Sequence, residues 1–333
     1  MQIAIRKNQN ASKHLKVKKM GFFSSLFFSK TEEDEQLKVD RKNFDILKYD
    51  GIRAQRMGKL EYAVKCLTEA LKIQKDFETM NYLITACYML NRYDEALEAI
   101  NGMVATGVEP AVTLFMRANL FFTMEKYAES AADCMQVLEL KPDHHVACFQ
   151  LAKSQRALGE TGKAIESLDR ATAIKPDFAE GYALRAEINI AMEKGNEALA
   201  DIEKLIELAP EDETAYLLRG RCYELLGDTG AAYLDYQQAS ELNPFNEDAY
   251  LLAGRLMMSL GKYDEAITIF DEAIEHNEKS ARAYAARAYA KHQTGDHDGA
   301  LEDEEMVKEL IPDEKEKPSG NHNFDDLYKG NII

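Results

Sequence analysis

Few side chains in this sequence have the type and spacing that catalysis or metal binding requires. The adjacent pair His144 and His145 follows the turn-forming stretch KPD, where a weak metal site competes with an ordinary exposed loop pair. Acidic runs such as DEEM are typical of solvated helix faces rather than of acid–base pairs. The motifs G-x-S-x-G and H-E-x-x-H and the phosphate-binding loop are missing. We therefore predict no catalytic residue, no metal site, no cofactor and no enzymatic activity.

The cysteines do not form a metal-binding or disulfide pattern. Cys66, Cys87, Cys134, Cys148 and Cys222 include no C-x-x-C pair, and their number is odd. Such residues are typically buried thiols in a reducing compartment, which predicts a cytoplasmic protein.

Charge and hydropathy exclude two further classes of protein. The formal net charge is −17 and the pI is about 5.0, which argues against a nucleic-acid partner because phosphate binding needs a positive surface. The longest strongly apolar stretch, residues 21–29, is shorter than the roughly 20 residues that a membrane-spanning helix needs.

The first 30 residues differ from the rest of the chain in carrying seven basic residues and no acidic one. Phe22, Phe23, Leu26 and Phe27 fall on one helical face there. Three interpretations stay open: a peripheral membrane contact through residues 20–30, a cap on the following domain, or a disordered tail. The stretch MGFFSS also matches an N-terminal acylation pattern if translation starts at Met20.

A small residue recurs along the chain in steps of 33 residues once and 34 residues six times. The series is Ala63, Ala96, Ser130, Ala164, Ala198, Ala232, Ala266 and Ala300. When these residues are placed at position 20 of a 34-residue repeat, further columns align. Position 8 is nearly always small, position 15 is mostly Gly, position 24 is large and apolar, and position 32 is mostly Pro.

Each column has a physical reason. Large apolar residues three to four positions apart share one helix face, and small residues at positions 8 and 20 let two helices approach closely. Gly or Asn at position 15 suits the left-handed residue that ends a helix, and Pro at position 32 stops the next one. Each repeat is therefore a helix hairpin that needs a neighbour to bury its apolar face.

This pattern resembles the tetratricopeptide repeat family, which has the same period and the same small-residue columns. The resemblance implies an all-α fold, a right-handed superhelical α-solenoid of tandem helix-turn-helix repeats. It covers eight repeats over residues 44–314, starting near 44, 77, 111, 145, 179, 213, 247 and 281. The family's favoured Trp at position 4 is missing, and the second repeat is the most degenerate, with Ile84, Met103 and Val108 in unusual positions.

The segments outside the repeats are short. Residues 1–43 form the basic and apolar lead-in, and residues 315–333 form a linker and a tail that either docks in a groove or frays. In the eighth repeat position 24 becomes Glu304, beside Asp303 and Glu305. We interpret these acids as a solvated face and predict that this repeat ends the array.

The family resemblance implies that a partner peptide or protein segment binds in a concave groove lined by the first helix of each repeat. Groove-facing positions 5, 9 and 12 bring together an aromatic group beside polar and basic residues. The candidate binding residues are Tyr88, Phe115, Asn119, Phe122, Phe149, Lys153, Arg156, Arg221 and Arg255. Such a surface suits a segment with acidic residues or a free carboxylate.

An alternative stays open, in which the Phe side chains only pack between helices and the cations pair with Glu187 and Glu224. The family's carboxylate clamp for chaperone C-termini is not expected, because Lys48 is followed by Ile52 and Asn119 is preceded by Phe115. We predict a non-catalytic interaction scaffold or adaptor in the cytoplasm. The alternatives are a non-catalytic subunit of an enzyme or membrane-associated complex, and an RNA-binding helical-repeat protein.

Overall fold

The computed structural model describes residues 34–311, and the regular structure in that range consists of sixteen α-helices without a strand. These residues fall into two compact units, here called the N-terminal unit (residues 34–142) and the C-terminal unit (residues 143–311). The predicted anchor, cap or tail at residues 1–33 and the apolar tail at residues 312–333 lie outside the described residues.

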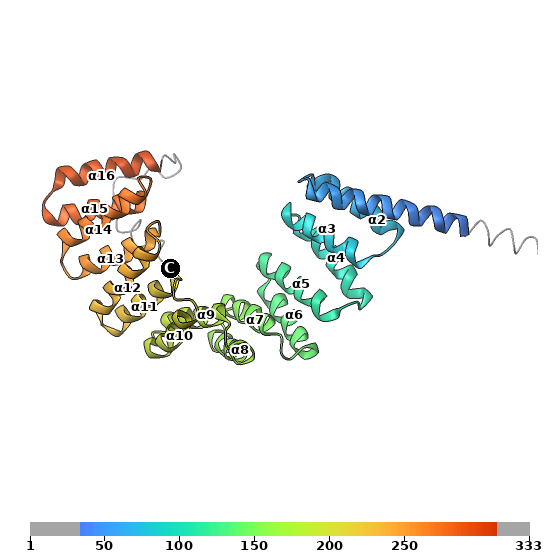
Figure 1. Ribbon diagram of the computed structural model, residues 1–333, viewed down its shortest axis with the longest axis horizontal. Coiled ribbons are helices and arrows are strands. Elements are labelled where there is room, and N and C mark those ends of the chain that lie inside the picture. The colour runs from blue at the N-terminus through green and yellow to red at the C-terminus, as the bar shows by residue number, and fades with distance from the viewer. Residues whose placement is uncertain (1–33, 312–333) are drawn as a thin grey trace, which may run out of the picture. The chain divides into compact units, whose positions relative to one another are not determined.

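Each unit is a row of antiparallel helix hairpins (Figure 1). The N-terminal unit begins with a helix over residues 34–56, which extends ahead of residue 44, and continues with α2 (Leu60–Ile73), α3 (Phe77–Met89), α4 (Tyr93–Thr106), α5 (Pro110–Thr123) and α6 (Tyr127–Leu140). The C-terminal unit contains α7 (His145–Ala157), α8 (Thr161–Ile174), α9 (Ala179–Ala191), α10 (Gly195–Leu208), α11 (Glu213–Leu226), α12 (Thr229–Leu242), α13 (Glu247–Ser259), α14 (Tyr263–His276), α15 (Ala281–Thr294) and α16 (His297–Leu310).

Every hairpin turns at position 15, where the backbone is left-handed in all eight repeats. Two backbone hydrogen bonds close each turn, as in the hairpin of α13 and α14, where the N–H of Gly261 donates to the carbonyl of Met258 and that of Lys262 to Met257. This is the Schellman ending of a helix, which satisfies its last carbonyl groups. Glu125 and Glu193 adopt the same left-handed backbone without being Gly.

The two helices of a hairpin touch where position 8 faces position 24 of the same repeat. A Cβ atom added to Gly51 would lie 2.7 Å from Cγ of Leu67, and one added to Gly220 or Gly254 would overlap the ring at position 24. Repeats with the largest residues at position 24, Tyr236 and Phe270, therefore have Gly at position 8, since only Gly leaves room for them. The residues at position 20, from Ala63 to Ala300, are all fully buried.

A buried ion pair recurs inside four hairpins, between Arg at position 7 and Asp at position 23. Arg185 donates two hydrogen bonds to Asp201, from Nε at 2.8 Å and from Nη2 at 2.5 Å. The equivalent pairs are Arg117–Asp133, Arg219–Asp235 and Arg287–Asp303. The hydrogen bond to its aspartate raises the pKa of each of these arginines.

Three of these arginines also reach the preceding repeat. Nη1 of Arg185 donates to Asp169 at 2.6 Å, and Arg287 makes the same bond to Asp271 at 2.5 Å. Arg117 donates instead to the amide oxygen of Asn101 at 3.0 Å. The guanidinium group therefore joins the two helices of its own hairpin to the neighbouring hairpin.

The interpretation of the eighth repeat's acids as a solvated face is wrong for two of the three. Asp303 is buried and binds Arg287 and Lys291, and Glu304 accepts a hydrogen bond at 3.0 Å from His292. Only Glu305 is exposed. The acid at position 23 belongs to the recurring ion pair, which the single-helix pattern did not reveal.

The turn between the second and third repeats differs from the others, in keeping with the degeneracy of the second repeat. The helix α4 ends at Gly107 in the left-handed conformation, and Glu109 ahead of Pro110 is also left-handed. Val108 occupies position 32 here, whereas Pro occupies it in the four turns that follow.

Gly254→Ala should lower the free energy of unfolding by about 1–3 kcal/mol, because the new methyl group overlaps Phe270. Gly102→Ala, in a helix and with nothing within 4 Å of the added atom, should be neutral or stabilise by up to about 1 kcal/mol. Urea unfolding followed by circular dichroism measures both. Adding Phe270→Leu to Gly254→Ala copies the Ala152–Leu168 pair and should restore much of the loss; equal stability of the two single variants would contradict the prediction.

Arg185→Leu should destabilise the C-terminal unit by about 3–5 kcal/mol, because it leaves the carboxylate of Asp201 buried without its partner. The double variant Arg185→Leu/Asp201→Ala copies Leu83 and Ala99 of the second repeat. Because it removes the buried carboxylate as well, it should be clearly more stable than Arg185→Leu alone. Thermal unfolding of the three proteins tests this, and a double variant as unstable as the single one would contradict it.

Candidate binding surfaces

The nine candidate binding residues divide between the two units. Tyr88 lies on α3, and Phe115, Asn119 and Phe122 lie on α5, all in the N-terminal unit. The other five lie on α7, α11 and α13 of the C-terminal unit. A single patch across the second to fourth repeats therefore stays a prediction, and each unit has its own geometry.

In the N-terminal unit the candidate aromatic residues join neighbouring helices. The hydroxyl of Tyr88 lies 3.1 Å from Oγ1 of Thr123 on α5, although 46% of the tyrosine is exposed. Phe122 packs edge-on against Tyr127, with ring centroids 5.3 Å apart. Asn119 is exposed, and Phe115 is half-buried. Tyr88 and Asn119 are thus the candidates of this unit with most surface to offer a partner.

In the C-terminal unit Phe149 takes part in packing between helices. Its ring meets the buried ring of Phe178 edge-on at 5.2 Å between centroids. The ammonium group of Lys153 lies 5.8 Å from the centre of the Phe149 ring, within the range of a cation–π contact. One face of Phe149 is therefore used inside the fold.

Successive first helices are joined by ion pairs between position 12 and position 9 of the next repeat. Nη1 of Arg156 donates to Glu187 at 2.7 Å, and Nη2 of Arg255 donates to Glu224 at 3.2 Å. Both acids are the counter-ions of the alternative left open by the sequence. These two arginines would have to exchange an internal partner for an external one.

Arg221 does not take part in this pattern of ion pairs. It lies at position 9 of the sixth repeat, and the residue at position 12 of the preceding repeat is Ile190. Within residues 34–311 no carboxylate lies within ion-pair distance of Arg221, and its side chain is half-buried. It is thus a cation with an apolar neighbour where the equivalent arginines have an acid.

A hydrogen-bond network next to Arg221 fixes its surroundings. The hydroxyl of the buried Tyr236 donates to Glu224, which also accepts from Arg255. The ring reaches Glu224 by passing Gly220, where a side chain would block it. Burial, and then the hydrogen bond to Glu224, raise the pKa of Tyr236, so the phenol stays protonated. Glu224 accepts both hydrogen bonds through Oε1, and among the described residues its ion pair is with Arg255 rather than with Arg221.

Other polar residues singled out from the sequence have structural roles. Lys48 is buried and pairs with Asp76 at 2.9 Å. His144 caps α7 by accepting the N–H of Ala147 at 3.0 Å, and the ring of His145 packs edge-on against Phe178. In residues 34–311 no three His, Cys, Asp or Glu side chains are grouped as a metal site would need. No helix in the same range is long and apolar enough to cross a membrane.

Sequence reasoning missed the Arg–Asp pairs of positions 7 and 23, because its columns were explained one helix at a time. The signal was present in the sequence as Arg and Asp separated by 16 residues in four repeats. It became visible only when both helices of the hairpin were compared together.

Two family models, both described as tetratricopeptide repeat, match this chain. One matches residues 121–188 and 225–290, and the other matches residues 184–247. Together they cover residues 121–290, just over half of the 333 residues. The chain belongs to the tetratricopeptide repeat family. Its sixteen described helices are consistent with about eight repeats.

Solved structures of other tetratricopeptide repeat proteins show the same fold. A tetratricopeptide repeat protein from Parabacteroides merdae has a TM-score of 0.53 and 15% identity, covering 86% of this chain and 98% of its own. PilW, described as a widely conserved type IV pilus biogenesis factor, has a TM-score of 0.53 and 21% identity, covering 62% and 96%. At these identities the similarity concerns the fold alone.

A curated relative is RNA polymerase II-associated protein 3 of Rattus norvegicus. It is 27% identical over 157 residues, which are 45% of this chain and 23% of that protein. The chain therefore matches less than a quarter of that relative's length.

The five cysteines are all free and buried, as the sequence predicted. Burial, with a smaller contribution from Glu95, raises the pKa of Cys87 to about 11, and burial also raises the pKa of Cys148 and Cys222. In the native protein at pH 8 these thiols should be protonated and shielded from the disulfide reagent DTNB, whereas all five should react in denaturant. Lys163→Cys, at an exposed position, is the positive control. Rapid labelling of native Cys87 would contradict the prediction.

Proposed function

We propose that this tetratricopeptide repeat protein is a non-catalytic interaction module whose first helices in the C-terminal unit bind an extended segment of a partner protein. In this proposal Arg221 binds a carboxylate of that segment, from an acidic side chain or a free C-terminus. The family's architecture is that of protein-interaction scaffolds, and the residues at positions 9 and 12 differ strongly between repeats.

The observation that carries the proposal is the charge of Arg221 without a counter-ion in the described part of the chain. A guanidinium group binds a carboxylate through two parallel hydrogen bonds, each charge-assisted bond contributing about 1.5–3 kcal/mol where water is excluded. Ile190 and the half-buried Leu217 supply apolar surface on either side of it. A segment with an acid next to an apolar residue would therefore match this stretch of α9 and α11.

Neighbouring residues favour selectivity rather than general attraction of anions. Glu187 and Glu224 form ion pairs with Arg156 and Arg255, whereas Arg221 has no ion pair among the described residues of this strongly acidic protein. An acidic protein repels polyanions such as nucleic acids at long range. A single well-placed carboxylate is thus preferred to a run of phosphates.

The state of the five cysteines bears on the cellular location of the protein. Five free buried cysteines are compatible with a reducing compartment, which supports a cytoplasmic location. The peripheral membrane contact through residues 20–30 stays a prediction outside the described residues. A partner that is itself an enzyme would make this chain a non-catalytic subunit.

Arg221→Glu should abolish capture of the partner, because it replaces the attraction for a carboxylate by repulsion. The measurement is affinity purification of the full chain from its own cells with quantitative mass spectrometry. The wild type is compared with Arg221→Glu and with Lys163→Glu, which makes the same charge change on the outer helix α8.

The specific partners are expected to be lost from Arg221→Glu by tenfold or more and retained by Lys163→Glu. For a captured partner, synthetic segments with the acid replaced by its amide should bind correspondingly more weakly. Equal capture by all three proteins, or equal binding of acid and amide, would refute the role of Arg221.

A further inference from the structure

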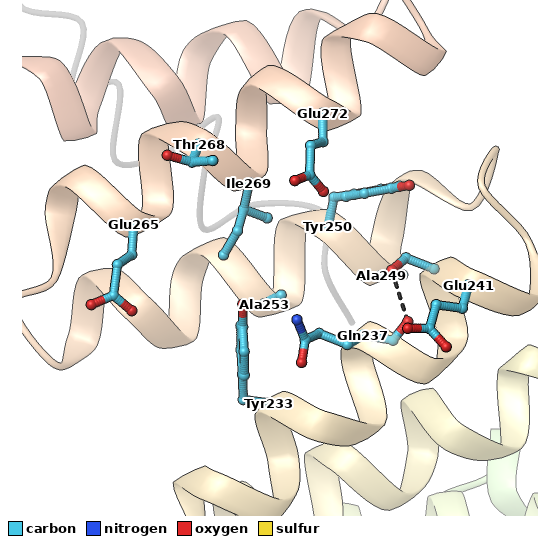
Figure 2. A pocket seen from close by; sticks show the side chains of 11 residues that line it. Tyr233, Gln237, Glu241, Ala249, Tyr250, Ala253, Glu265, Thr268, Ile269 and Glu272 are labelled. Atoms are coloured by element: carbon cyan, nitrogen blue, oxygen red, sulfur yellow. Dashed lines mark hydrogen bonds between the residues drawn. The ribbon is translucent and has the colours of Figure 1, made fainter.

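The seventh repeat contains a pocket on the side of its second helix, away from positions 5, 9 and 12. It lies among α12, α13 and α14 of the C-terminal unit and has a volume of about 330 Å³ (Figure 2). Its lining includes Gln237, Glu241, Tyr250, Ala253, Ile269 and Glu272.

The pocket coincides with the place that an arginine fills in other repeats. Its floor is formed by Ala253 at position 7 and Ile269 at position 23. Four repeats place the Arg–Asp pair at these two positions, and the second and fourth repeats place Leu83 and Leu151 at position 7. In the seventh repeat the short side chain of Ala253 leaves that space open.

The surroundings that receive the arginine in the other repeats are still present. Tyr250 lies at position 4 of its repeat. In three other repeats the arginine at position 7 lies over the tyrosine at position 4, with the guanidinium carbon 5.5, 5.4 and 5.4 Å from the ring centres of Tyr182, Tyr216 and Tyr284. Gln237 lies at position 25 of the preceding repeat, where the amide of Asn101 accepts from Arg117. The pocket thus keeps an aromatic platform and an amide acceptor without the cation.

Its charge is negative. The lining includes three carboxylates and no cation, and Glu265 is paired with Lys262 at the rim at 3.1 Å. Glu272 lies beside the ring of Tyr250 (Figure 2), and after burial its charge is the next cause that raises the pKa of Tyr250 and of Tyr233. A guanidinium group entering here would meet Glu272 in place of the missing aspartate at position 23.

We propose that this pocket binds an arginine side chain presented by a partner protein. The planar guanidinium group would stack on Tyr250 and donate to Gln237 and Glu272, whereas a lysine ammonium has no planar face to stack and presents its donors from a single nitrogen. This site is separate from Arg221 and does not depend on the proposed function. It has the opposite charge preference, so one partner segment could engage both only by offering both an acid and an arginine.

Saturation-transfer NMR with N-acetyl-L-arginine methylamide tests the pocket on the full chain. A single side chain should bind with a Kd on the order of 1–10 mM. The isosteric neutral probe N-acetyl-L-citrulline methylamide should give no saturable signal, and the lysine analogue should bind several-fold more weakly. Glu272→Gln should raise the Kd several-fold, whereas Glu275→Gln, the same change at an exposed site of α14 outside the pocket, should not.

The decisive variant is Ala253→Arg/Ile269→Asp, which installs the chain's own Arg–Asp pair and fills the pocket. It should abolish binding of the arginine probe while circular dichroism shows a folded protein. If it fails to fold, Ala253→Leu/Ile269→Ala, a copy of Leu83 and Ala99, takes its place. Wild-type affinity in the folded filled variant, or equal binding of the citrulline probe, would overturn the proposal.

Discussion

The structure depends on the close approach of two helices at position 8 of each hairpin. In every repeat except the second, which has Ile84, a glycine or alanine there lets the residue at position 24 lie directly against the opposite backbone, as Phe270 does over Gly254. Because the helix separation is set by this contact, the larger the residue at position 24, the smaller its partner must be. The two largest residues, Tyr236 and Phe270, face glycines, and Leu168 and Ile202 face alanines, whereas the degenerate second repeat departs from the rule with Ile84 facing Ile100.

Once the hairpin backbone is fixed in this way, position 7 and position 23 face each other in every repeat. In four repeats a bidentate Arg–Asp pair fills the space between them, and in the second and fourth repeats leucine at position 7 does so. Both solutions avoid an unpaired buried charge. The guanidinium group adds a bond to the preceding hairpin, as Arg185 does to Asp169. The same geometry therefore sets the contacts within a hairpin and between neighbouring hairpins.

The helices were predictable from the sequence because their determinants are local and repeated. Small residues at position 20 and the left-handed residue at position 15 recur at one period, and both mark backbone geometry directly. The contacts among the candidate binding residues were not predictable in this way. Whether Arg156 finds Glu187, or whether Asp303 is buried, depends on residues 31 and 16 positions apart on different helices. Grouping Phe115 with Phe149 stays a prediction, since the two lie in different units.

At the regular positions the side chains pair or pack with one another. We therefore expect partner binding at the positions that depart from the repeat pattern. Arg221 has Ile190 where an acid would complete the ion pair, so within residues 34–311 its charge has no counter-ion. Ala253 and Ile269 occupy positions 7 and 23, where four other repeats have Arg and Asp, and this leaves a cavity in the place of the arginine side chain. The two departures are complementary in kind, because one lacks a carboxylate and the other lacks a guanidinium group. In a repeat protein the neighbouring repeats thus indicate what each irregular site lacks, and so the chemistry of the ligand that would fit it.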